Sequence, residues 1–133
     1  MTIIETLKNW ADVEFNLLDD KPDLKDYSNS IIVRWFFFGS CDICAQAMDL
    51  DDDEFQYFLK TLLQHIGVSE DDIDELITKW MLDKIDDNEL FIINQGALGF
   101  RAFETNPNGV GNLKQCLLDF TGKFHLKLSL IHI

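Results

Sequence analysis

Two cysteines three positions apart, Cys41 and Cys44, are the clearest candidates for chemistry in this sequence of 133 residues. Such a pair can exchange a disulfide bond or supply half of a zinc site. A zinc site needs four ligands, and the chain adds only Cys116 and three scattered histidines. A redox pair of the thioredoxin type needs an α/β pattern around it, which the helical segments that follow do not provide. We therefore expect buried, reduced thiols, with no metal and no cofactor.

A run of carboxylates from Asp49 to Glu54 is the second candidate, because its spacing is that of the start of a calcium-binding loop. Such a loop needs glycine at its sixth position and glutamate at its twelfth, where this chain has Glu54 and Lys60. The pattern therefore fails, and capping of a following helix explains the same acids. Asp42 lies inside an apolar segment, two helical turns from Arg34, and a buried pair of this kind is more often structural than catalytic. We expect no catalytic residue.

Acidic residues are concentrated between Asp12 and Glu89, where 21 acids and six bases give a net charge of −15, against −13 for the whole chain. This charge repels nucleic acid and anionic membranes, and it favours either a basic protein partner or simple solubility. Disorder is not its explanation, because 47% of the residues are hydrophobic and 11 of them are phenylalanine. The acids must therefore lie mainly on the surface of a folded core.

Local signals predict helices along most of the chain. Thr2 and Glu5 have the spacing of a capping box at the start of a first helix. Asp51 and Ser69 are suited to cap two amphipathic helices with apolar stripes, and Gly67 stands where the first of these should end. These two helices would begin with acids, which the helix dipole favours in a first turn.

The apolar segment Ser30–Met48 approaches the length of a membrane span, but it contains Arg34 and Asp42. Two central charges cost about 2.5–3.5 kcal/mol each on insertion scales, so we predict a core helix instead. A helix that is apolar on nearly every side lies either in the centre of a core or at an oligomer interface. The aromatic run Trp35–Phe38 therefore leaves a homodimer open.

The last third of the chain is ambiguous. Glu89–Glu104 is compatible with a helix in which Gly96 and Gly99 allow close packing, and equally with a hairpin. Residues 123–133 alternate between apolar and polar side chains, which is typical of a strand. The final Leu128–Ile133 resembles the translation of a sequencing adaptor, which would make the tail non-native.

These segments, with a short helix over Asn112–Phe120, predict a single compact all-α domain across residues 1–133. We expect five to six helices, with an α+β fold carrying a short C-terminal strand or hairpin as the alternative. The N-terminus lacks the basic and apolar regions of a signal peptide, and an odd number of cysteines fits reduced thiols. We therefore expect a cytoplasmic protein.

Three functional hypotheses remain. The first is a non-enzymatic binding protein that engages a basic protein surface as an inhibitor, an immunity or antitoxin-like protein, or an anti-defence mimic of nucleic acid. It would contact neither nucleic acid nor membrane directly, and it would use the acids that open the two amphipathic helices: Asp51, Asp52, Asp53, Glu54, Glu70, Asp71, Asp74 and Glu75. The second is a small acidic chaperone or adaptor with a phenylalanine-rich face. The third is a thiol- or metal-dependent protein using Cys41 and Cys44.

Overall fold

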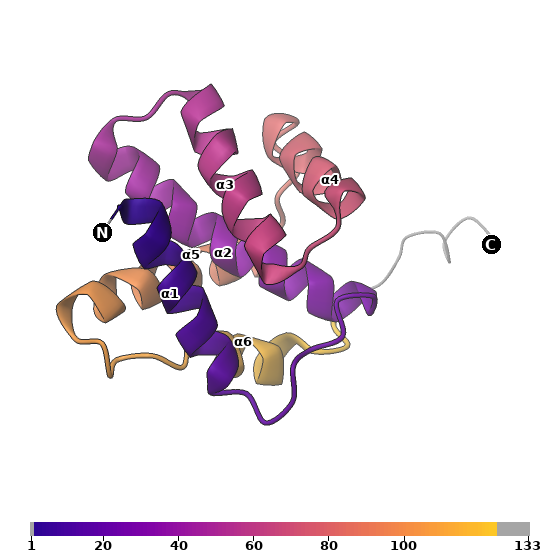
Figure 1. Ribbon diagram of the computed structural model, residues 1–133. Coiled ribbons are helices and arrows are strands. Elements are labelled where there is room, and N and C mark those ends of the chain that lie inside the picture. Colours follow the sequence, from indigo (N-terminus) through magenta and orange to yellow (C-terminus); the bar gives the residue numbers. More distant parts are fainter. Residues whose placement is uncertain (1, 125–133) are drawn as a thin grey trace, which may run out of the picture.

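The computed structural model describes residues 2–124 and contains six helices and no strand within that range. Figure 1 shows them packed around one long central helix. Their bounds are α1 Ile3–Asn16, α2 Tyr27–Met48, α3 Asp52–Ile66, α4 Glu70–Met81, α5 Asp87–Thr105 and α6 Asn112–Phe120. The all-α prediction is therefore confirmed, and the helix count lies at the upper end of the expected range.

Helix α2 forms the centre of the core because it is apolar on nearly every side. Its aromatic run Trp35–Phe38 is buried, together with Trp10 of α1 and Phe100 of α5. Trp10 stacks on Phe36 at a ring-centroid distance of 5.5 Å and meets Phe37 edge-on at 5.2 Å. Such offset and edge-to-face pairs add about 0.5–1.5 kcal/mol each to the burial of area.

Helices α2 and α5 make the closest crossing in the fold, and glycine makes it possible. A Cβ atom on Gly39 of α2 would lie 1.9 Å from the carbonyl oxygen of Ile93. A Cβ atom on Gly96 of α5 would lie 1.7 Å from the carbonyl oxygen of Phe36. The backbones of α2 and α5 are therefore in direct contact, with Gly39 facing α5 and Gly96 facing α2. Close packing through Gly96 belonged to the helical one of the two alternatives for this segment, whereas the role of Gly39 was missed.

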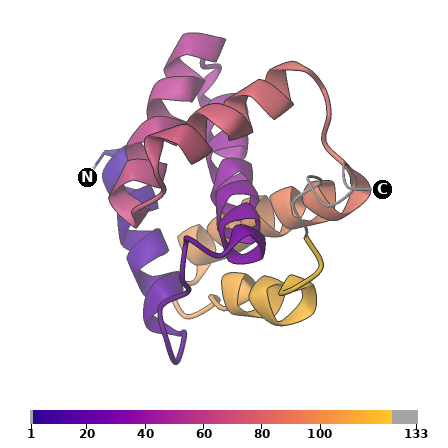
Figure 2. The ribbon, with the colours of Figure 1, turned by 90° about the vertical axis from the view of Figure 1, so that its right-hand side faces the viewer.

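The remaining helices lie on two sides of α2. Helices α3 and α4 cover one side and diverge from the short turn that joins them, whereas α5 and α6 cover the opposite side (Figure 2). Amphipathic stripes explain this arrangement, since Leu59 and Leu62 of α3 and Ile73 and Leu76 of α4 are all buried. Trp80, near the end of the α4 stripe, is only partly buried.

The predicted caps are present. Thr2 and Glu5 form a capping box at α1, and Asp51 and Glu54 form one at α3. Gly67 ends α3 with a φ of 104°, in the left-handed region that favours glycine. Ser69 accepts a hydrogen bond from the Asp72 amide at the start of α4, as expected.

Helix α6 has no side-chain cap of its own because Gly111 precedes it. Glu14 of α1 takes this role, and its carboxylate accepts hydrogen bonds from the amides of Gly111 at 3.2 Å and Leu113 at 3.1 Å. This buried carboxylate satisfies N–H groups that the helix leaves free, and it fixes α6 to α1. No local sequence pattern indicated the contact, because the partners are almost 100 positions apart.

Three expectations need correction or fall outside the structure. Glu89–Glu104 lies within the α5 helix, so the hairpin alternative is wrong. The aromatic run Trp35–Phe38 is buried within the chain, so it offers no surface for the predicted homodimer or for a phenylalanine-rich binding face. The strand predicted over residues 123–133 and the adaptor-like end fall almost wholly outside the described residues.

Candidate functional site

The eight predicted contact acids lie on two helix starts, and all are exposed. We call them the acidic surface: Asp51, Asp52, Asp53, Glu54, Glu70, Asp71, Asp74 and Glu75. The first four open α3 and the last four belong to the first turns of α4. Because α4 begins where α3 ends, the two groups are separated by the length of α3, about 22 Å for its 15 residues. The structure therefore forms two acidic groups rather than one cluster.

Most carboxylates of the acidic surface form no salt bridge with a basic side chain of the described residues. Within the part of the chain that the structure describes, the salt bridges join Arg34 to Asp72 and Glu75, His65 to Asp12, and Lys79 to Glu89. Of the acidic surface only Glu75 takes part. Among residues 2–124, the other members face solvent without a basic side chain within 4.0 Å, so their negative charge is available to a partner.

Arg34 is the one base in the central helix and is only 2% exposed. Its guanidinium lies 3.3 Å from the Asp72 carboxylate and 3.4 Å from that of Glu75, both on α4, and its Nε donates to the Ser30 hydroxyl at 2.9 Å. Asp42, the partner suggested by the sequence, is instead hydrogen-bonded to Gln46 at 2.9 Å. A buried guanidinium needs such partners, since an unpaired charge in the core is costly.

Glu89 is the matching buried carboxylate on α5. It accepts hydrogen bonds from the Trp35 indole N–H and from Lys79 Nζ, the latter at 2.7 Å. It also completes a capping box with Asp86 at the start of α5. Sequence reasoning missed this residue, although the Asp-x-x-Glu spacing of Asp86 and Glu89 is a capping signal that could have located it. Arg34 and Glu89 together tie α4 to α2 and α5.

The three thiols are free and buried. Burial raises the pKa of Cys41 far above its usual value, and burial together with nearby acids raises the pKa of Cys44 and of Cys116 to about 12. Thiols in this state are protonated at neutral pH, and the thiolate is the form that attacks disulfides or binds metal. Among the described residues no group of three or more His, Cys, Asp or Glu side chains is placed to hold a metal ion. The geometry supports the packing role expected for Cys41 and Cys44.

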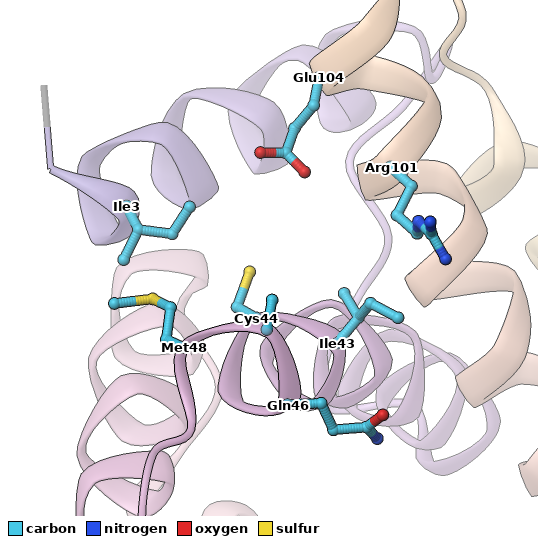
Figure 3. A pocket seen from close by; sticks show the side chains of 8 residues that line it. Ile3, Ile43, Cys44, Gln46, Met48, Arg101 and Glu104 are labelled. Atoms are coloured by element: carbon cyan, nitrogen blue, oxygen red, sulfur yellow. The ribbon is translucent and has the colours of Figure 1, made fainter.

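One hollow of about 510 Å³ lies between the start of α1 and the C-terminal turns of α2 and α5. We call it the apolar cup. Its apolar walls come from five side chains: Ile3, Ile43, Cys44, Ala47 and Met48. Figure 3 shows the Cys44 thiol at its base and the Glu104 carboxylate directed into it, with Arg101 across from Ile3. Gln46 also lines it but turns away, toward Asp42.

A second, more polar hollow of about 390 Å³ adjoins the cup. Gln46 lines both, and the second hollow also includes Asp42, Asp49, Asp52 and Trp80. Asp52, at the start of α3, and the apolar cup therefore lie on either side of the last turns of α2. Sequence reasoning missed the cup because its walls come from three separate helices.

Comparison with known proteins found no matching protein-family model, no matching curated protein and no matching solved structure. By length and composition, α2 could span a membrane. However, 72% of its apolar 18-residue stretch is buried inside the fold, as in the core helix of a folded domain.

Proposed function

We propose that this chain is a non-enzymatic, cytoplasmic binding protein whose acidic surface engages a basic surface on another protein. In this role it would act as an inhibitor, an immunity or antitoxin-like protein, or an anti-defence mimic of nucleic acid. It would bind neither nucleic acid nor a membrane directly, because a net charge of −13 repels both.

The observation that carries the proposal is the uneven pairing of the acids. Acids that face the core have partners within the chain, since Asp72 pairs with Arg34, Glu89 pairs with Lys79, and Glu14 accepts hydrogen bonds from the start of α6. In the described residues the acidic surface, Glu75 apart, forms no salt bridge. An exposed charge without an intramolecular partner breaks no ion pair when it binds an opposite charge, and it increases the association rate with a basic partner.

The separation of the two acidic groups suits a broad partner surface. A span of about 22 Å along α3 is comparable to the width of a standard interface, which buries about 800 Å² on each partner. A DNA-binding protein presents cations over such a distance, because duplex DNA carries one charge per about 1.7 Å of its axis. The mimic hypothesis is therefore sterically reasonable for this arrangement.

The test compares two variants of equal net charge. In the acidic-surface variant four acids that make no side-chain hydrogen bond or salt bridge within residues 2–124 are neutralised: Asp52→Asn, Asp53→Asn, Asp71→Asn and Asp74→Asn. In the charge-matched control four exposed acids elsewhere are neutralised: Asp19→Asn, Asp20→Asn, Asp87→Asn and Asp119→Asn. Proteins captured from the source cell by the wild type are identified by mass spectrometry, and the purified partner's Kd is then measured for all three proteins.

We expect a basic partner whose Kd rises about tenfold or more for the acidic-surface variant, because each exposed pair contributes about 0.2–1 kcal/mol. The control should change Kd by less than about threefold, since it alters only net charge. Equal weakening by both variants, or capture of partners without a basic surface, would show that the acidic surface is not the specific contact.

A further inference from the structure

The apolar cup combines three features that point to an occupant. Its walls are apolar, and the Cys44 thiol at its base is held in the neutral form by burial. Met48 on its rim is 48% exposed, although a methionine usually covers apolar surface. Its volume of about 510 Å³ falls in the range of pockets that bind ligands.

The charges around the cup indicate what kind of occupant fits. Glu104 extends its carboxylate into the cup (Figure 3) and has no salt bridge in the described part of the chain. Asp49 and Asp52 lie beyond Gln46, in the adjoining hollow. Arg101, across the cup, offers donors that fit a main-chain carbonyl. An apolar floor with acids on two sides complements an apolar side chain flanked by basic residues.

We propose that the apolar cup receives an apolar side chain from a basic segment of the partner, with lysine or arginine neighbours held by Glu104 and Asp52. This inference rests on the proposed function and adds an anchor to it. Exposed charge governs the rate and selectivity of encounter, whereas a buried apolar anchor supplies most of the affinity of an interface. The cup is the site where such an anchor adjoins the acidic surface.

The probes are three synthetic peptides, Lys-Arg-Leu-Arg-Lys, Lys-Arg-Gly-Arg-Lys and the uncharged Ser-Ser-Leu-Ser-Ser, each capped at both ends. Their Kd values are measured by isothermal titration or fluorescence anisotropy at low salt. The cup is filled by Ala47→Phe, a change at an exposed position of α2. Ala102→Phe, at an exposed position of α5 that does not line the cup, is the matched control.

We expect the leucine peptide to bind about tenfold more tightly than the glycine peptide, as burial of one leucine side chain predicts. Ala47→Phe should remove that preference without changing the Kd of the glycine peptide, and Ala102→Phe should preserve it. Methyl resonances of Ile3 and Met48 should shift only with the leucine peptides. Equal binding of the two basic peptides, an unchanged preference in Ala47→Phe, or no binding of the basic leucine peptide at ~1 mM would overturn the inference.

If the proposed function is wrong, the peptides give a different result from the one expected if only the cup proposal is wrong. If the acidic-surface variant binds the basic glycine peptide as tightly as the wild type does, the acidic surface is not the contact, whatever the cup prefers. If the uncharged leucine peptide binds as tightly as the basic one, the occupant is apolar only, and Glu104 and Asp52 do not hold basic neighbours.

Discussion

Replacing Gly96 by alanine tests the crossing of α2 and α5. The new Cβ would lie 1.7 Å from the Phe36 carbonyl oxygen, and the neighbour is backbone, which cannot rotate away. The helices would have to separate by more than about 1 Å, a gap that removes a quarter to a half of the dispersion energy of the contacts involved. Overpacking of this kind costs about 1–3 kcal/mol, occasionally more.

Alanine also favours helix by about 1 kcal/mol relative to glycine, which offsets part of the loss. Because the contact is between two backbones at the centre of the core, we expect an overpacking cost at the upper end of that range and a net loss of about 2 kcal/mol. Urea unfolding followed by circular dichroism measures this loss as a lower midpoint at an unchanged slope. Gly99→Ala is the control, since its Cβ would meet only side chains at 3.3 Å or more. If Gly96→Ala is as stable as Gly99→Ala, the backbones do not touch in solution.

Two further predictions concern buried titratable groups. Burial raises the pKa of Glu14 above its usual value, and hydrogen bonds from Leu113 and Gly111 oppose this shift. The protonated form of Glu14 therefore contributes stability at low pH, and this contribution is lost as pH rises through the folded pKa. In paired urea titrations from about pH 4 to 7, the wild type should therefore lose stability relative to Glu14→Gln, and parallel pH profiles would contradict this. The buried thiols Cys41, Cys44 and Cys116 should react with Ellman's reagent at pH 8 only after unfolding, whereas rapid labelling of the native protein would show that one of them is accessible.

Local patterns in the sequence predicted the helices and their ends well. The capping boxes at Thr2 and Asp51 and the left-handed Gly67 involve residues within four positions of one another, so their geometry follows from the chain itself. The all-α class follows from the same signals. The predicted exposure of the eight contact acids also agrees with the structure, because charge at the start of an amphipathic helix rarely enters a core.

Contacts between distant segments were not predictable in this way. An isolated Arg34 in an apolar segment indicates a buried cation, but which acids it meets depends on how α4 packs against α2. The same holds for Glu14, which caps a helix almost 100 residues away, and for Gly39, whose role appears only when α5 is in place. The apolar cup has walls on three helices, so no window of sequence contains its pattern.

Asp74 is the member of the acidic surface that best distinguishes a structural role for these acids from a role in binding a partner. Asp51 and Glu54 cap α3, and the dipole favours acids in the first turn of each helix, so local physics accounts for much of the charge. Asp74 lies beyond the first turn of α4, four positions after Glu70, where two like charges destabilise a helix by about 0.2–0.5 kcal/mol. It makes no side-chain hydrogen bond or salt bridge in the described residues. Local helix energetics therefore do not explain this carboxylate. Under the proposed function, Asp74→Asn should raise the partner's Kd while the urea midpoint stays the same or increases.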